Sequence, residues 1–438
     1  MTRKVCLFLL AALPLAAEFR WIEQQFGGIE CASCAGSLER SLGRLRGVRA
    51  ASVDPARSVV RLDLEEGNRI KLDDLRDRIK GAGFTPGGAE VRVAGVLRRS
   101  GDQWRLDAGI PVVYDLEWKG VQAPAADADG KSVVIAGDVP ASAGAAPQAL
   151  LQVRALTVTL PLAERIGRTD PAKYNVRKGV HAGAGELHYM TVLARDTLDN
   201  LNFLHRGVVM PKSSIGHHFH NISEEIFFIF GGEGEFTIDG RTSRLVGPVG
   251  VPLRGGHSHA LYNPTDKPLE WMNISVRLPG VDPNPVVRDP AATFDLGDDR
   301  ANVTLDPKPV FMTMPLDHAL LQSVERMNGG KGTVRYRRLL GPSVYTSNWA
   351  YIDHVVVPPG ASIGRHKHEG VEEFYYVIDG RGSVTVNRES SAIGKGDAVP
   401  VRFGEVHSFE NTGPEDLEML TIGIAKVKGE LDTVDVVE

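Results

Sequence analysis

The sequence is short of three things: cysteine, long apolar runs and charge of a single sign. Only three cysteines occur in 438 residues, and the net charge is −5. No basic stripe is present, which argues against a nucleic-acid-binding protein. Beyond the N-terminus, no stretch approaches the ~20 apolar residues that a transmembrane helix needs. With 42% apolar and 24% charged residues the composition is that of a globular protein, and the length predicts three or four domains.

The N-terminus is typical of a secretory signal. Arg3 and Lys4 precede the apolar stretch Val5–Leu15 and the small residues Ala16-Ala17. The apolar stretch is too short to span a bilayer, so we expect residues 1–17 to be a signal peptide that is removed. An uncut N-terminal anchor is the alternative. The sequence therefore predicts a periplasmic or secreted protein with no membrane span after cleavage.

Cys31 and Cys34 form a CxxC motif. Three interpretations are open: a thiolate pair for a soft metal, a redox disulfide, or an incidental disulfide in an exported protein. A strand, a helix, two strands and a helix are expected in the order β-α-β-β-α, at residues 19–26, 37–45, 48–53, 59–64 and 72–82. A Cys at a helix N-terminus has a lowered pKa, which favours the thiolate and metal capture. Two thiolates alone suit linear Cu(I) better than tetrahedral Zn²⁺.

This segment resembles the heavy-metal-associated domain of copper chaperones and transport ATPases. The residues that carry the resemblance are Gly28, Cys31, Ala32, Ser33, Cys34, Ala35, Gly47, Val48, Gly83 and Phe84. The sequence departs from the family pattern at Ile29 and Glu30, neither of which affects the thiolates. The resemblance implies a small ferredoxin-like α+β domain over residues 18–89 that holds Cu(I) or another soft metal.

Residues 90–160 are less informative. Five short strands are expected, which favours a small β-barrel or sandwich, with an OB-like fold among the candidates. The strands carry neither an aromatic stacking row nor a cationic groove. We interpret this segment as a small β domain or spacer.

The rest of the chain contains one pattern twice, 148 residues apart, which fits a duplicated domain rather than a solenoid repeat. Gly216–Gly232 (GHHFHNISEEIFFIFGG) and Gly364–Gly380 (GRHKHEGVEEFYYVIDG) each place two His one residue apart and a Glu five positions later. In an extended strand alternate side chains share a face, so both His of a pair point the same way. A third His follows in each copy, because Gly250–Asn263 aligns without gaps to Ala398–Asn411.

Each copy thus supplies three His and one Glu, which together can bind a transition metal. The two sets are His218, His220, Glu225 and His259, and His366, His368, Glu373 and His407. They resemble the two motifs of the cupin superfamily, over about half of the chain. The resemblance implies a mainly β chain with two double-stranded β-helix barrels, at 161–282 and 317–438, joined by a Pro-rich linker at 283–316. Each barrel is expected to hold one divalent metal, with Cu, Zn, Mn and Fe as candidates.

Three further residues are candidates for acid–base chemistry. Tyr375 faces inward beside the expected metal, where the first copy has Phe227. His257 and Glu405 stand at equivalent positions, two residues before the third His of each copy. Either could move protons or orient a ligand, and the alternative for both is a solvent-facing residue at the barrel rim.

Two classes of function are open. A metal held by three His and one Glu keeps positions for O₂ or substrate, which favours a metal-dependent dioxygenase, decarboxylase or isomerase. Its substrate would be a small oxygen-rich molecule. The alternative is a bicupin that stores metal or binds a ligand without turnover. The expected partners are metal ions and a small molecule, and the oligomeric state stays open.

Overall fold

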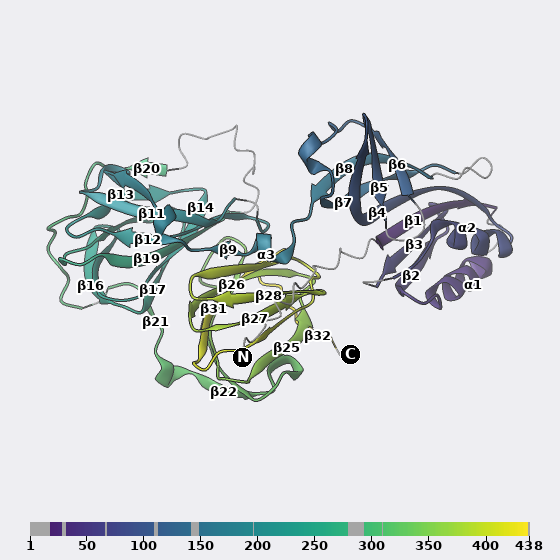
Figure 1. Cartoon of the computed structure of the whole chain (residues 1–438). Helices are drawn as coiled ribbons and strands as arrows, with labels where there is room; N and C mark the ends of the chain where they lie inside the picture. Colours follow the sequence, from purple (N-terminus) through teal and green to yellow (C-terminus); the bar gives the residue numbers. More distant parts are fainter. Residues whose placement is uncertain are drawn as a thin grey trace, which may run out of the picture. The chain divides into compact units, whose positions relative to one another are not determined.

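The computed structural model describes residues 18–28, 32–65, 68–108, 113–141, 149–195, 197–278, 293–308 and 310–436. The expected signal peptide and Cys31 lie outside these residues, as does the side chain of Cys34. The chain divides into two compact units, Met1–Pro161 and Leu162–Glu438 (Figure 1). Among the described residues, no helix is both long and apolar enough to cross a bilayer.

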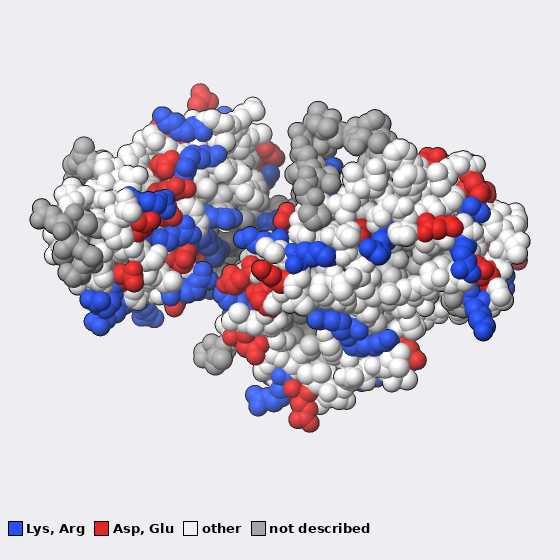
Figure 2. Space-filling view, turned by 180° about the vertical axis from the view of Figure 1, so that it is seen from behind, with Lys and Arg blue, Asp and Glu red and all other residues white. Residues whose placement is uncertain are grey.

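Charged side chains of both signs are spread over the surface. On the face shown in Figure 2, Lys and Arg side chains are interspersed with Asp and Glu side chains on each unit. This face therefore offers no continuous basic area of the kind that binds nucleic acid.

The first unit is built on a single sheet in the order β2-β3-β1-β4-β5-β6-β8-β7, in which β4 also pairs with β7. That extra pairing closes β4 to β8 into a ring, which is the expected small β-barrel. The elements are β1 (Glu18–Gly27), α1 (Ala32–Gly43), β2 (Val48–Asp54), β3 (Val59–Leu64), α2 (Leu72–Gly81), β4 (Thr85–Ser100), β5 (Gln103–Asp107), β6 (Val113–Trp118), η1 (Ala126–Ala128), β7 (Ser132–Val139) and β8 (Ala149–Val158).

Helix α2 shows how the sequence builds the first part of this unit. Its buried residues include Leu72, Leu75 and Ile79, which form one apolar stripe at helical spacing. Acidic residues stand in its first turn and basic residues in its last turn, where each complements the helix dipole. The β-α-β-β-α order predicted for this region is therefore present.

Strand β4 joins the two parts of the first unit. It pairs with β1 from Thr85 to Ala94 and with β5 from Val96 to Ser100, so it belongs to both parts. The buried residues of both parts form one continuous core. The boundary expected between residues 89 and 90 thus falls inside a strand, and the α+β part shares its core with the barrel.

The second unit contains two barrels of the same topology, each made of two sheets. In barrel 1 the sheets run β10-β11-β12-β19-β14-β17-β21 and β16-β15-β18-β13-β20, and in barrel 2 they run β22-β23-β24-β31-β26-β29-β9 and β28-β27-β30-β25-β32. In chain order the elements of this unit begin with α3 (Leu162–Arg165), β9 (Gly167–Arg168), η2 (Pro171–Lys173), β10 (Asn175–Lys178), η3 (Val180–Ala182), β11 (Glu186–Leu193), β12 (Leu201–Val209), β13 (Ser214–His220), β14 (Ser223–Ile229), β15 (Glu233–Ile238), β16 (Arg241–Val246), β17 (Val249–Leu253), β18 (Ser258–Tyr262), β19 (Leu269–Arg277) and β20 (Thr293–Asp295). Those that follow are β21 (Met314–Pro315), η4 (His318–Leu320), β22 (Gln322–Glu325), η5 (Met327–Gly329), β23 (Thr333–Leu340), β24 (Trp349–Val357), β25 (Ser362–Lys367), β26 (Val371–Asp379), β27 (Arg381–Val386), β28 (Glu389–Gly394), β29 (Asp397–Val401), β30 (His407–Glu410), β31 (Leu417–Ala425) and β32 (Val434–Asp435). The mainly β fold and the duplication are confirmed.

The two barrels exchange short strands. β9 precedes barrel 1 in the chain but pairs with β29 of barrel 2, whereas β21 precedes barrel 2 but pairs with β17 of barrel 1. The described parts of the Pro-rich segment lie on barrel 1, because β20 pairs with β13 and Leu305 bridges to Thr242. The connection between the barrels is therefore part of their sheets.

Strands β14 and β26 are buried on both faces, which explains why their sequences are almost continuously apolar. In β14, Phe227 and Ile229 face the interior of barrel 1, while Ile226 and Phe228 join the core between the barrels. In β26 the same alternation sends Tyr375 and Val377 inward and Phe374 and Tyr376 to the shared core. This two-sided burial fixes the register of the strands that carry Glu225 and Glu373.

Candidate metal centres

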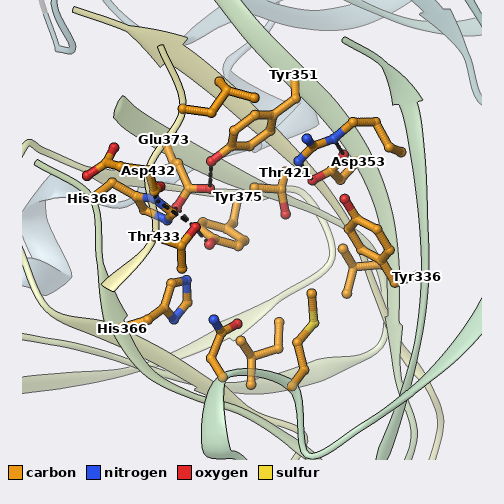
Figure 3. Close-up of a pocket in the computed structure, with 16 residues that line it drawn as sticks. Tyr336, Tyr351, Asp353, His366, His368, Glu373, Tyr375, Thr421, Asp432 and Thr433 are labelled. Atoms are coloured by element: carbon orange, nitrogen blue, oxygen red, sulfur yellow. Dashed lines mark hydrogen bonds and ion pairs between the residues drawn. The ribbon is translucent and has the colours of Figure 1, made fainter. Parts of the chain in front are cut away.

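Barrel 2 brings its four predicted ligands together. His366 on β25 stands opposite His407 on β30, and Glu373 lies on β26. One ligand atom from each of His366, His368, Glu373 and His407 lies within 4.8 Å of the others, and all four residues are buried. Figure 3 shows His366, His368 and Glu373 directed into the same cavity.

Glycine at position 364 allows this arrangement. A Cβ on Gly364 would lie 2.1 Å from the carbonyl oxygen of Asn328, so no larger residue fits. The same approach occurs in barrel 1, where a Cβ on Gly216 would lie 1.9 Å from the carbonyl oxygen of His181. Each glycine also supplies the carbonyl oxygen that holds the first His of its pair, at 2.9 Å for His366 and 2.7 Å for His218.

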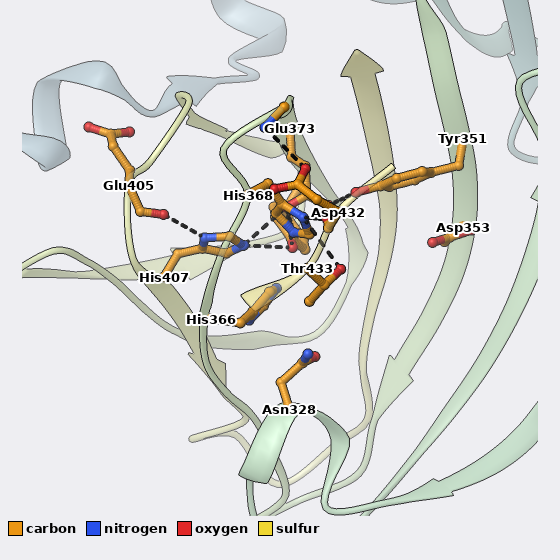
Figure 4. A network of polar contacts seen from close by, with 12 residues as sticks. Asn328, Tyr351, Asp353, His366, His368, Glu373, Glu405, His407, Asp432 and Thr433 are labelled. Carbon is orange, nitrogen blue, oxygen red and sulfur yellow. Dashed lines mark hydrogen bonds and ion pairs between the residues drawn. The ribbon is translucent and has the colours of Figure 1, made fainter. Parts of the chain in front are cut away.

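The imidazoles of barrel 2 are oriented by backbone carbonyls. Nδ1 of His366 contacts Gly364 O, Nδ1 of His407 lies 3.1 Å from Glu405 O, and Nδ1 of His368 contacts Asp432 O (Figure 4). Such contacts fix the tautomer and leave Nε2 free to bind a metal. Nε2 of His368 is buried, and its one polar contact among the described residues is with the Glu373 carboxylate at 3.3 Å. These features fit a divalent metal at this point.

Glu373 is the charged centre of the cluster. Its carboxylate accepts hydrogen bonds from the hydroxyls of Tyr351 (2.7 Å) and Tyr375 (2.8 Å). It also lies 3.0 Å from Nε2 of His407 and 3.3 Å from Nε2 of His368. Burial alone would raise the pKa of Glu373, but the two imidazoles hold it well below its ordinary value. The ligand therefore stays ionised.

The pKa values of two barrel 2 histidines are shifted in opposite directions. Burial lowers the pKa of His366 to about 4, so its imidazole is neutral near pH 7. Burial alone would also lower the pKa of His368, but the Glu373 carboxylate raises it to about 9. A metal must therefore displace a proton from His368 when it binds.

The cluster opens into a cavity of about 300 Å³. Beside the ligands, its wall carries five polar residues, namely Tyr336, Arg338, Tyr351, Asp353 and Thr421. Arg338 donates two hydrogen bonds to Asp353, at 2.9 and 3.0 Å. The C-terminal residues Leu431, Asp432 and Thr433 complete the lining, and the Asp432 carboxylate is held by the backbone N–H of Glu369 and Gly370.

Barrel 1 assembles the equivalent set. Ligand atoms of His218, His220 and His259 lie within 4.8 Å of one another, and Glu225 lies 3.4 Å from His220 Nε2 and 3.5 Å from His259 Nε2. Nδ1 of His259 is buried without a hydrogen-bond partner among the described residues, and its Nε2 has only the 3.5 Å contact with Glu225, which fits a cation between them. Burial alone would raise the pKa of Glu225, but His220 and His259 hold it well below its ordinary value.

The mouths of the two barrels differ. In barrel 1 the ring of His181 stacks on His218 at 3.7 Å, and its Nδ1 lies 2.6 Å from Asp295 Oδ1. In barrel 2 the equivalent position is Asn328, which donates to Asp435 at 3.0 Å. A fourth imidazole thus stands beside the ligands of barrel 1 but not beside those of barrel 2 in the described structure.

The three acid–base candidates have different surroundings. Tyr375 lines the cavity and contacts both Glu373 and His407. The Glu405 carboxylate points away from the cluster in Figure 4 and forms an ion pair with Arg165, at 2.5 Å. His257 is 46% exposed and lies 2.6 Å from Asp239. Tyr375 is therefore the candidate that can act on a molecule in the cavity.

Sequence reasoning missed most of the cavity wall. Tyr351, Asp353 and Val355 alternate along β24, so the same two-residue period that located the ligands would have placed them inward. Arg338 stands on β23 within an Arg-rich run, whose composition alone does not indicate which arginine faces the cavity. No local signal places Asp432 there, because its contact with His368 joins residues 64 positions apart.

Comparisons with known proteins identify two families in this chain. Residues 353–423 match the Cupin domain family, and residues 26–85 match the Heavy-metal-associated domain family. A stretch of 101 residues is 39% identical to the Oxalate-binding protein of Thermotoga maritima, which covers 23% of this chain and 84% of that protein. A stretch of 57 residues is 33% identical to the Copper chaperone CopZ of Staphylococcus haemolyticus, which covers 13% of this chain and 82% of that protein. Among solved structures, the Oxalate Decarboxylase from Bacillus subtilis is similar, with a TM-score of 0.42 and 20% identity over 62% of this chain and 78% of that one.

Proposed function

Because the chain belongs to the cupin family and carries a heavy-metal-associated domain, we propose that barrel 2 is a metal-dependent active site for a small oxygen-rich acid. The observation that carries this proposal is the cluster of four buried ligands at the wall of a polar cavity of about 300 Å³. The Thermotoga maritima relative makes oxalate the first acid to examine. The reaction would be of the dioxygenase, decarboxylase or isomerase type.

The metal ligands and three wall residues, Arg338, Tyr351 and Asp353, have roles in this proposal. A divalent metal bound by the four ligands would act as a Lewis acid toward an oxygen of the substrate. Arg338 offers a planar guanidinium to a carboxylate, and its side chain is anchored by Asp353 and by the ring of Tyr351 at 4.3 Å. Burial raises the pKa of Asp353 against the opposing effect of Arg338, and the two hydrogen bonds that this carboxylate accepts from Arg338 fix the direction of the guanidinium.

Oxalate binding to the metal-loaded protein tests this proposal. We expect Arg338→Gln to weaken oxalate binding, measured by calorimetry, by about 10-fold or more, because it removes a charge-assisted bidentate contact. Arg337→Gln is the matched control, since Arg337 contacts Pro315 O outside the cavity and should bind oxalate like the wild type. Absence of oxalate binding to metal-loaded wild type would contradict this choice of substrate.

The same experiment separates turnover from storage. The bound acid is recovered after incubation with the metal-loaded protein under air and analysed for conversion. Conversion that depends on metal supports an enzyme. Quantitative recovery of unchanged acid favours the alternative, a bicupin that binds its ligand without turnover.

We further propose that Cys31 and Cys34 capture Cu(I) as thiolates. The support is the match to the Heavy-metal-associated domain and the identity to a copper chaperone. The full chain with Cys31→Ser and Cys34→Ser should bind one Cu(I) equivalent fewer than the wild type, measured by competition with a Cu(I) chelator. A fragment that ends near residue 90 is unsuitable, because it would cut β4. Equal Cu(I) binding by both proteins would favour the redox or inert interpretation.

A copper-capture domain on the same chain can serve the barrels in two ways. A tether keeps it at high local concentration near them, so it could deliver copper or withhold it from barrels meant for another metal. Under limiting copper, delivery predicts less copper in the barrels of the double Cys→Ser variant, whereas protection predicts more. Identical occupancy would show that the two functions are unconnected.

A further inference from the structure

A third His–Glu cluster lies outside the two barrel interiors. It consists of His318 in η4, His354 on β24 and Glu418 on β31, whose ligand atoms lie within 4.8 Å of one another. Nε2 of His354 is 2.7 Å from Oε1 of Glu418, and Nε2 of His318 is 3.0 Å from the same oxygen. His354 is fully buried, and Glu418 is 16% exposed. Two imidazoles thus converge on one carboxylate oxygen.

The duplicated fold allows this cluster to be compared with the equivalent position in barrel 1. In barrel 1 the strand equivalent to β24 is β12 and that equivalent to β31 is β19. His354 is paired with Leu420 and Glu418 with Val356, while Arg206 is paired with Met272 and Glu270 with Val208. His354 and Glu418 of barrel 2 therefore occupy the same ladder positions as Arg206 and Glu270 of barrel 1.

The two barrels neutralise the carboxylate at this position differently. In barrel 1 the Arg206 guanidinium forms an ion pair with Glu270 and also donates to Tyr376 Oη at 2.9 Å. That guanidinium carries a permanent positive charge. In barrel 2 the positive charge that compensates the Glu418 carboxylate must come instead from a proton on an imidazole or from a bound cation. A partly buried carboxylate of this kind is costly unless it is compensated.

The donor set and its setting suit a metal cation. Two imidazole nitrogens and one carboxylate oxygen are ligands for Zn²⁺ or Cu²⁺. The present N–O separations of 2.7 and 3.0 Å are hydrogen-bond distances. Tetrahedral ligands at ~2.0 Å from an ion lie ~3.3 Å apart, so the three side chains must separate by a few tenths of an ångström to admit it. The His318 side chain is 47% exposed, which provides an entry path and a side open to water.

We propose that His318, His354 and Glu418 form a third metal site, for Zn²⁺ or Cu²⁺, separate from the two sites inside the barrels. Its position gives it a mechanical consequence. η4 follows β21, which pairs with barrel 1, whereas His354 and Glu418 belong to the sheet of barrel 2. A metal here joins the connecting segment to the outer face of barrel 2. The site is independent of the chemistry proposed for the barrel cavity.

The test counts Zn²⁺ equivalents bound by the full chain, with Zn²⁺ as the added probe and calorimetry as the readout. We expect His318→Ala to bind one equivalent fewer than the wild type and to gain less melting temperature from added Zn²⁺. Because His318 is half exposed, the variant should fold normally, which its melting temperature without Zn²⁺ verifies. Glu418→Gln should lose the same equivalent.

The matched control is His188→Ala. His188 lies 3.2 Å from Glu186 on the surface, so it is a His–Glu pair without a second imidazole, and its loss should not change the stoichiometry. Equal numbers of Zn²⁺ equivalents in wild type and His318→Ala would overturn the proposal and assign the compensating charge to a proton. A loss that His188→Ala reproduces would also overturn it, because the binding would then be nonspecific.

Discussion

Replacing Glu224 with Gln is expected to lower the free energy of unfolding of the barrel unit by about 1–3 kcal/mol for each hydrogen-bond donor that the amide leaves unpaired. Glu224 on β14 of barrel 1 is fully buried. Its carboxylate accepts hydrogen bonds from the backbone N–H of Thr346 (2.9 Å) and Ser347 (2.6 Å), which belong to barrel 2. Both hydroxyls donate to it as well, at 2.8 and 2.5 Å. An amide in this place would present its own N–H₂ to these donors and leave some of them unpaired.

The second barrel provides the control for this substitution. Glu372 on β26 is the equivalent residue, and it accepts from the backbone N–H of Asp199 in barrel 1. Burial raises the pKa of Glu372 to about 7, so it is about half protonated at that pH. For Glu224, burial alone would raise the pKa, but the donors at Ser347 and Thr346 hold it below its ordinary value.

Glu372→Gln should therefore cost about 1 kcal/mol or less at pH 7, because the amide resembles the protonated carboxyl. Chemical denaturation of the metal-free proteins at pH 7 measures both values. Without metal, a change in metal affinity at the neighbouring ligands Glu225 and Glu373 does not contribute to the measured stability. A similar cost for the two variants would show that the interface does not depend on the charge of Glu224.

The metal ligands could be predicted because their information is local. His366 lies on β25 and His368 directly follows the end of that strand, so the two-residue period of an extended chain is enough to place both on one face. The second copy then located His407 by alignment alone. The same period also applies to Tyr351 and Asp353 on β24. Recognising this strand in the sequence is therefore enough to predict that both residues line the cavity wall.

Other features depend on pairings that no local pattern encodes. The exchange of β9 and β21 between barrels joins residues far apart in sequence, and each strand has only two residues. The division expected near residue 90 falls inside β4, because a strand that pairs with the α+β part at one end and with the barrel at the other shows no change in composition where its partners change. Position 354 shows a third limit: the 148-residue repeat places it over Arg206, but the register of both barrels is needed to show that each of these residues stands near the glutamate of its neighbouring strand.

Replacing His366 with Ala is expected to remove one metal equivalent from the protein, and replacing His218 with Ala should remove another. Each change deletes one of four ligands, and the loss of a direct ligand should cost more than the 10–100-fold in affinity that outer-shell changes cost. Metal analysis after dialysis against a weak chelator measures the equivalents that remain. Full retention of metal in both variants would refute the assignment of the two sites.

The two variants should differ in one respect. In barrel 1, His181 stacks on His218 at 3.7 Å, so a second imidazole is available when His218 is lost. In barrel 2 the residue at the equivalent position is Asn328, and a neutral amide is a poorer ligand for a transition metal. We therefore expect the affinity of barrel 1 to fall less in His218→Ala than that of barrel 2 in His366→Ala. The double variant His181→Ala/His218→Ala should remove the difference, and an equal fall in both single variants would exclude His181 as a replacement ligand.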